Sequence, residues 1–319
     1  MIEMKDVSRT YGDLVALDRL TLSIGEGEVF GFIGPNGAGK STTMKILACL
    51  LRPSSGSATV AGRSVLTDGD EIRRLVGYMP DFLGVYDDLT VDEYLQFFAA
   101  AFRIPASRRR ATVDGVLELT DLVGKRDAMV DSLSRGMQQR LGIASVLIHD
   151  PKVLLLDEPA SGLDPRARIE MRSLLTELAR MGKTIMVSSH ILSELAEMCT
   201  SIGIIERGRL LYAGSIQDAY ARTHAGERIA ITLEDGDEAA RERARAALAR
   251  VEGVAGVTRD PERPDQIVVE LAPPAPGRAQ SHHGVLEALL ASGVRVASFT
   301  PRQVKLEDAF LRLTKGALQ

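Results

Sequence analysis

The sequence predicts a chain of two α/β-type domains. Over residues 1–221, short apolar runs that end in small or charged residues alternate with helical segments, as in a layered domain around a mostly parallel sheet. After the polar segment ARTHAGE the composition shifts toward Arg and Ala, and short elements follow in β-α-β-β-α-β order. A length of 319 residues is enough for two domains. We therefore expect an α/β domain over residues 1–221 and a small α+β, ferredoxin-like domain over residues 222–319.

Three apolar runs organise the larger domain. EVFGFIG, KVLLLDEP and TIMVSSH are typical of strands that are buried on both faces and carry functional groups at their carboxyl ends. Helices are expected directly after the first and third runs. Between the first and second runs, residues 88–150 are mostly helical in pattern, and TVDE at residues 90–93 forms a capping box that opens one helix. This stretch predicts a helical subdomain.

The smaller domain shows no convergent set of catalytic residues. Its expected strands are 228–233, 254–258, 266–271 and 293–299, and its expected helices are 237–250, 283–292 and a last one from about residue 304.

Composition and charge argue against a nucleic-acid binder. A formal net charge of -4 lacks the basic footprint of a nucleic-acid binder. Cys49 and Cys199 are far apart and have no partner at metal-binding or redox spacing, which indicates buried thiols in a reducing compartment. The chain begins without the pattern of a signal peptide, and nowhere do about 18 apolar residues run together. We expect a cytosolic chain that does not itself span a membrane.

A phosphate-binding loop follows the first predicted strand. GPNGAGKST fits the pattern G-x-x-x-x-G-K-[ST] and opens a helix, which is the required context. Glycines at positions 34, 37 and 39 would let the backbone curl so that its N–H groups face a polyphosphate, aided by the helix dipole. Lys40 supplies a point charge, and the Ser41 hydroxyl is a hard oxygen ligand for Mg²⁺. The residues expected to contact nucleotide are Gly34, Pro35, Asn36, Gly37, Ala38, Gly39, Lys40, Ser41 and Thr42.

Two adjacent acids end the second predicted strand. Asp157 would hold Mg²⁺ through water, and Glu158 is placed to polarise an attacking water molecule. Carboxylates are rarely buried unless they are paired or bind a metal, so this pair favours a catalytic site.

These motifs resemble the nucleotide-binding domain of an ABC ATPase. The resemblance rests on the phosphate loop, LSRGMQQR, the acid pair, SGLD at residues 161–164 and the histidine after TIMVSS, in that family's order, and it covers residues 1 to about 220. It implies that Tyr11 stacks on adenine and that His190 contacts the γ-phosphate. It also implies that Asp164 belongs to a loop that links two facing sites.

The segment LSRGMQQRLGIAS would serve the nucleotide of a second chain. Ser134 and Gly136 stand at the start of a helix, where a hydroxyl, free N–H groups and the helix dipole can bind an anion. In the family this turn closes over the γ-phosphate held by the opposite subunit. The resemblance therefore implies a homodimer with two ATP molecules between its subunits.

The sequence departs from the usual family pattern in two places. Arg135 and Met137 replace a glycine and a glutamine of the signature turn, a variant that resembles the ATPase subunits of bacterial ABC-2-type exporters. Those subunits often carry a small C-terminal domain that ends much like LEDAFLRLT. Asp81 stands where the family usually has a glutamine that touches Mg²⁺. Asp81 could bind Mg²⁺ directly or through water, or it could only cap the turn PDFLG.

The resemblance implies an ATP- and Mg²⁺-dependent ATPase that dimerises on ATP. It would drive a separate ABC-2-type permease, as an exporter, from the inner face of the cell membrane. One alternative is a non-transport ABC ATPase of translation or DNA repair, but the chain has neither a second cassette nor a long coiled coil. Another is a nucleotide-gated regulatory module in which Asp81 impairs hydrolysis. An ATPase assay separates the regulatory module from the main prediction.

Overall fold

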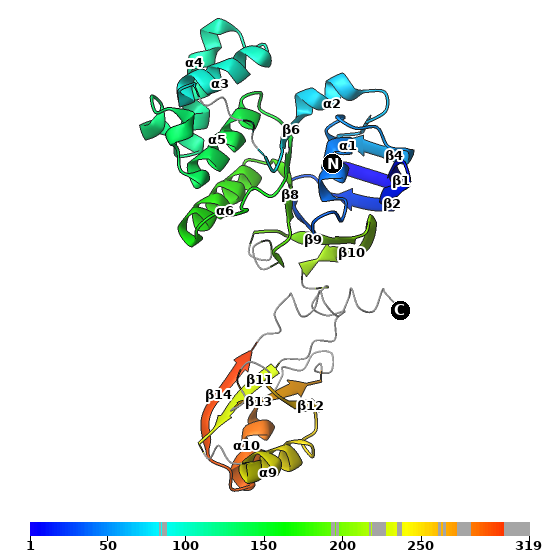
Figure 1. Cartoon of the computed structure of the whole chain (residues 1–319), viewed down its shortest axis with the longest axis vertical. Coiled ribbons are helices and arrows are strands. Elements are labelled where there is room, and N and C mark those ends of the chain that lie inside the picture. Colours follow the sequence, from blue (N-terminus) through cyan, green and yellow to red (C-terminus); the bar gives the residue numbers. More distant parts are fainter. Residues whose placement is uncertain are drawn as a thin grey trace. The chain divides into compact units, whose positions relative to one another are not determined.

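The chain forms two compact units. The computed structural model describes residues 1–82, 84, 88–192, 195, 198–216, 218, 228–234, 238–260, 263, 266–272 and 282–302. The two units are Met1–Ile216 and Gln217–Gln319 (Figure 1). The predicted boundary between residues 221 and 222 lies outside the described residues and stays a prediction.

A six-stranded sheet forms the centre of the larger unit, in the order β10-β9-β3-β8-β7-β6. The strands from β9 to β6 are parallel, and β10 pairs antiparallel with β9 at one edge. Every residue of β3, β7 and β8 is buried, which confirms the three apolar runs as strands covered on both faces. The bounds are β3 Val29–Ile33, β6 Val76–Met79, β7 Val153–Leu156, β8 Thr184–Ser189, β9 Ser201–Glu206 and β10 Arg209–Ser215.

A second, antiparallel sheet has the order β2-β1-β4-β5. Apolar side chains of β1, β2 and β4 join those of β3, β7 and helix α1 in one core cluster. This shared core holds the two sheets and the first helix together, so a site can be built across them. The bounds are β1 Ile2–Tyr11, β2 Leu14–Ile24, β4 Ser55–Val60, β5 Arg63–Ser64, α1 Lys40–Leu47 and α2 Gly69–Leu75.

The helices from α3 to α6 gather on one side of the larger unit (Figure 1). The stretch predicted as mostly helical holds α3 Val91–Ala101, α4 Ala106–Leu119 and α5 Arg135–Leu147, and α6 Pro165–Arg180 follows β7. The capping box is confirmed, because Thr90 Oγ1 accepts from the Glu93 N–H at 3.3 Å and Glu93 Oε2 accepts from the Thr90 N–H at 2.8 Å. In the described part of the chain, no helix has the length and apolar character needed to cross a bilayer.

The smaller unit has the predicted β-α-β-β-α-β order, with an antiparallel sheet in the order β12-β13-β11-β14. The predicted start of the last strand at residue 293 was wrong. Gly293 has a φ of 70°, and its N–H donates to the carbonyl oxygen of Leu290 in α10. Gly293 therefore ends that helix and does not begin the strand. The helix predicted from residue 304 lies outside the described residues. The bounds are β11 Arg228–Leu233, α9 Glu238–Leu248, β12 Val254–Arg259, β13 Gln266–Leu271, α10 His283–Ala291 and β14 Val296–Arg302.

Candidate active site

The candidate residues follow four neighbouring parallel strands. The phosphate loop comes after β3, Asp81 after β6, the acid pair after β7 and His190 after β8. Carboxyl ends of parallel strands meet at one edge of a sheet, where α/β proteins place their ligand sites. Side chains more than a hundred positions apart in the sequence therefore lie together.

The phosphate loop needs glycine for two different reasons. Gly39 caps α1 with φ of 111°, and a Cβ there would lie 2.7 Å from the Ala16 carbonyl oxygen. Gly34 has no positive φ, and its predicted part in the curl of the loop stays a prediction. A Cβ at Gly34 would instead overlap the carbonyl oxygen of Ile205 on β9. Gly34 is therefore required for close backbone approach.

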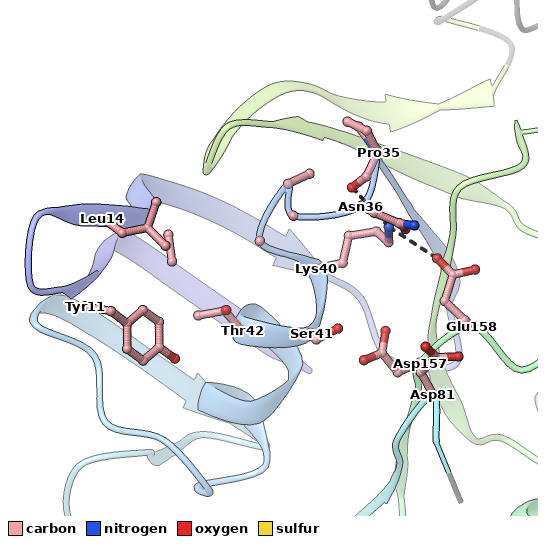
Figure 2. A pocket seen from close by; sticks show the side chains of 14 residues that line it. Tyr11, Leu14, Pro35, Asn36, Lys40, Ser41, Thr42, Asp81, Asp157 and Glu158 are labelled. Atoms are coloured by element: carbon pink, nitrogen blue, oxygen red, sulfur yellow. Dashed lines mark hydrogen bonds and ion pairs between the residues drawn. The ribbon is translucent and has the colours of Figure 1, made fainter.

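The loop forms one wall of a pocket of about 270 Å³ (Figure 2). The pocket brings together all of the predicted nucleotide contacts of the loop except Gly34, together with the three acids and Tyr11 from the antiparallel sheet. Sequence reasoning missed Leu14 and Ala16, although Leu14 pairs directly with Tyr11 across the β1–β2 turn. The pocket is lined by Tyr11, Leu14, Ala16, Pro35, Asn36, Gly37, Ala38, Gly39, Lys40, Ser41, Thr42, Asp81, Asp157 and Glu158.

A buried ion pair joins the loop to the acid pair. Lys40 Nζ lies 3.2 Å from Glu158 Oε1, and both side chains are about nine-tenths buried. The same ammonium donates to the carbonyls of Gly34 at 2.7 Å and Pro35 at 3.3 Å. Lys40 is thus held at the pocket by three oxygen partners, as a point charge able to meet phosphate oxygens.

Glu158 is oriented by its backbone and by His190. Its φ is 51°, a region that non-glycine residues adopt rarely and that often occurs at functional sites. Its Oε2 lies 2.9 Å from His190 Nδ1, while Oε1 accepts no hydrogen bond from the residues that the structure describes. His190 therefore holds Oε2, while Oε1 is held only by the ion pair with Lys40 among the residues that the structure describes.

Ser188 positions the acid pair, and sequence reasoning did not single it out. Its Oγ donates to Asp157 Oδ1 at 2.6 Å and accepts from the Glu158 N–H at 2.9 Å. The serine is fully buried on β8, next to β7 in the sheet. The only signal in the sequence was a serine inside an apolar strand, which indicates a buried hydroxyl with a polar partner.

Three oxygen donors fit a Mg²⁺ ion. Ser41, Asp157 and Asp81 line the pocket and point into the same part of it (Figure 2). A hydroxyl and two carboxylates match this hard ion, which keeps several water ligands. Among the described residues there is no cluster of three or more His, Cys, Asp or Glu side chains with metal-binding geometry, so a bound Mg²⁺ would depend on water and phosphate for its other ligands.

The electrostatics around Asp81 favour a cation. Partial burial raises the pKa of Asp81, and the negative charges of Asp157 and Glu158 raise it further, while Arg135 and Lys40 oppose the shift. Burial, and then the same Asp157 charge, also raise the pKa of Tyr78 to about 12. A divalent cation among these acids would relieve their mutual repulsion. Residue 83 lies outside the described residues, so the alternative of Asp81 as a turn cap stays open.

Comparison with known proteins identifies the family. A family model described as ABC transporter matches residues 17–161. The Nod factor export ATP-binding protein I of Burkholderia orbicola is 35% identical over 100% of this chain and 98% of its own length. This chain belongs to the ATP-binding proteins of ABC transporters. The daunorubicin resistance ATP-binding protein DrrA3 of Streptomyces coeruleorubidus is 34% identical over 98% of this chain and 95% of its own length.

Solved ABC ATPases share the fold of the larger unit. An ATP-binding subunit of an ABC transporter matches with a TM-score of 0.63 and 29% identity, over 70% of this chain and 92% of that one. A dimeric ATP-binding cassette bound to ADP and Pi matches with a TM-score of 0.62 and 28% identity, over 68% of this chain and 99% of that one. As an ABC transporter ATP-binding protein, the chain is an ATPase coupled to transport. ABC ATPase domains dimerise and work with a membrane permease.

The signature turn of this ABC ATPase stands at the start of α5. Ser134 caps α5, its Oγ accepting from the Met137 N–H at 3.4 Å, and neither Ser134 nor Gly136 is among the described residues that line the pocket. The Arg135 guanidinium lies over Gly162 of SGLD, in the space that a Cβ would fill. Asp164, in the same loop, caps α6 by accepting from the Ala167 N–H at 2.9 Å.

Proposed function

We propose that this pocket binds ATP with Mg²⁺ and that Glu158 is the general base for its hydrolysis. The supporting observation is the buried approach of Lys40 to Glu158, at 3.2 Å, on the wall of a pocket formed by the phosphate loop. The backbone N–H groups of the loop and Lys40 hold the phosphates, and Tyr11 stacks on the adenine. His190 contacts the γ-phosphate.

The chemistry is an in-line transfer of the γ-phosphoryl group to water. The bond from the γ-phosphorus to its bridging oxygen breaks while a bond to the water oxygen forms, and the water proton passes to Glu158. Oε1 of Glu158, which pairs with Lys40 and accepts no hydrogen bond from the described residues, takes that proton, and His190 keeps the carboxylate oriented. Lys40 stabilises the negative charge that develops on the phosphate oxygens. Mg²⁺, held by Ser41 and Asp157, would further neutralise this charge when bound.

Asp81 would help to hold Mg²⁺ through a water molecule in this proposal. Its carboxylate is one methylene shorter than the glutamine usual in the family, and Mg²⁺ gives up its waters reluctantly. Burial, and then the negative charges of Asp157 and Glu158, raise the pKa of Asp81, and a cation bound beside these acids would offset that repulsion.

The working form is a homodimer that drives an ABC-2-type permease. One chain carries one phosphate loop and one signature turn, so two copies related by a twofold axis complete two sites, with Ser134 and Gly136 each facing the other subunit's ATP. Two relatives that match over nearly their whole length are named for Nod factor export and daunorubicin resistance, which supports an exporter. The chain would then work on the inner face of the cell membrane, held by its permease. A gene for a membrane protein with several apolar spans beside this one would support the pairing.

The ATPase role of the pocket is tested by Glu158→Gln. This change removes the base and keeps size and hydrogen bonding, so ATP binding should persist while turnover falls by about 10²–10⁴-fold. Lys40→Ala should instead weaken ATP binding itself. Near-normal hydrolysis by Glu158→Gln in a clean preparation would contradict the role of Glu158. Absence of hydrolysis by the wild-type chain would favour the regulatory module.

A further inference from the structure

Tyr11 has an arginine on one face of its ring. The guanidinium carbon of Arg9 lies 4.6 Å from the ring centroid, over the ring. The two residues are two positions apart on β1, so their side chains leave the same face of the strand. Tyr11 lines the pocket, whereas Arg9 is not among its described lining residues. One face of the ring is therefore covered by Arg9, and the other is the face that a ligand in the pocket can use.

The arginine is fixed in place by the loop that follows α1. Its Nη1 donates to the carbonyl oxygen of Arg52 at 3.0 Å, and the neighbouring Thr10 N–H donates to Ser54 Oγ at 3.1 Å. The Nε of Arg9 is buried and has no hydrogen-bond partner among the described residues. A buried N–H without an acceptor is costly, and the electron-rich face of an aromatic ring can offset part of that cost. The contact between Arg9 and Tyr11 thus belongs to an anchored arrangement.

We infer that Arg9 is a positioning residue for the nucleobase, holding Tyr11 in a sandwich of guanidinium, phenol ring and purine. The inference rests on the proposed binding of ATP in this pocket. A cation on one face of the ring restricts the ring's rotation, and it draws electron density from the face on which the base stacks. Both effects favour stacking of an electron-rich base. The phosphate groups of ATP take no part in the contact between Arg9 and Tyr11. Arg9 should therefore contribute to ligand binding only when the ligand carries a base.

The test compares a ligand with a base to one without. Titration calorimetry would measure the binding of ATP and of inorganic tripolyphosphate, each with Mg²⁺, to the full chain. Arg9→Met removes the cation and keeps the length of the side chain. It should weaken ATP binding by about 2- to 5-fold, the range for a partly exposed cation–π contact, and leave tripolyphosphate binding unchanged. Arg9→Lys should retain more of the ATP affinity than Arg9→Met.

Two further variants show how the effect arises. In a Tyr11→Ala chain, Arg9→Met should cause no additional loss of ATP affinity, because the ring that transmits its effect is gone. Arg63→Met is the matched control. Arg63 lies on β5, in the same antiparallel sheet as Arg9 and Tyr11, and it does not line the pocket in the described part of the chain. Arg63→Met should leave the binding of both ligands unchanged.

The outcomes separate this inference from the proposed function. Equal losses of ATP and tripolyphosphate affinity in Arg9→Met would overturn the inference in favour of a long-range charge effect or a folding defect. Unchanged ATP affinity in Arg9→Met, with normal wild-type binding, would overturn the inference alone. A wild-type chain that binds neither ligand would refute the proposed function and the inference with it.

Discussion

Ser188→Ala would remove the hydroxyl that joins the two acids of the site. Ser188 Oγ donates to Asp157 at 2.6 Å and accepts from the Glu158 N–H at 2.9 Å, and the serine is 0% exposed. The alanine keeps the backbone and adds no volume. The change therefore leaves a buried carboxylate oxygen and a buried N–H without their partner, beside a residue whose φ of 51° is already strained.

The magnitude follows from these two contacts. A hydrogen bond to a charged group contributes about 1.5–3 kcal/mol, and a buried N–H left without an acceptor costs about 1–3 kcal/mol. Water can enter from the adjoining pocket and replace part of this loss, so we expect a fall of about 3 kcal/mol in the free energy of unfolding. For a unit of this size, about 1 kcal/mol corresponds to about 2–4 °C, so the melting temperature should fall by about 6–12 °C.

Function should weaken together with stability. Loss of a group that orients a metal ligand commonly lowers metal affinity by about 10- to 100-fold, so the Mg²⁺ concentration for half-maximal ATPase activity should rise by that factor.

Thermal unfolding followed by circular dichroism and a magnesium titration of ATPase activity provide the measurements. Ser145→Ala is the matched control, because Ser145 is a buried serine outside the pocket lining whose Oγ donates to the Gly142 carbonyl at 2.7 Å. That carbonyl lies within α5, so Ser145→Ala should cost less than about 1 kcal/mol. A melting temperature and a magnesium curve of Ser188→Ala that both match the wild type would refute the reasoning.

Three further predictions concern assembly, the metal and the loop. In the Glu158→Gln background, ATP but not ADP should convert the chain to a dimer in analytical ultracentrifugation. Adding Ser134→Arg should block dimer formation while ATP binding persists. A dimer that survives Ser134→Arg would refute the role of the signature turn at the other subunit's ATP. Asp81→Asn should raise the Mg²⁺ concentration needed for half-maximal ATPase activity and Asp81→Gln should preserve activity, whereas an unchanged curve for Asp81→Asn would remove Asp81 from the metal site. Gly34→Ala should destabilise the fold by about 1–3 kcal/mol in denaturant unfolding, because its methyl group meets the Ile205 carbonyl; wild-type stability would show that β9 can move aside.

Local sequence patterns predicted much of the fold. The three buried strands and the capping box at Thr90 were predictable because burial, strand length and helix capping depend on residues close together in the chain. In the smaller unit, the predicted bounds of β11 and β13 match those in the structure. The start of β14 was missed because Gly293 can either lead into a strand or end a helix, and only its backbone angle decides.

The candidate site was predictable as a set of motifs and not as a set of contacts. The phosphate loop, the acid pair and Asp81 each have a recognisable neighbourhood in the sequence, and the pocket contains all three. Nothing local indicates that the hydroxyl joining the acids comes from β8 or that Leu14 lines the same pocket. Those residues are selected by strand order and register, which depend on how the whole core packs.

The sequence by itself determined the family, the kind of chemistry and the positions of the phosphate loop, because these need particular residue types at short, constant spacings. Tertiary structure alone decided that Lys40 meets Glu158, that Ser188 joins the acids and that Arg9 covers one face of Tyr11. Lys40 and Glu158 are more than a hundred positions apart in the sequence, and Ser188 is about thirty positions from the acids. Arg9 is anchored by a hydrogen bond to the backbone of Arg52. Distances across such separations are set by sheet order and core packing, which no short segment of the chain contains.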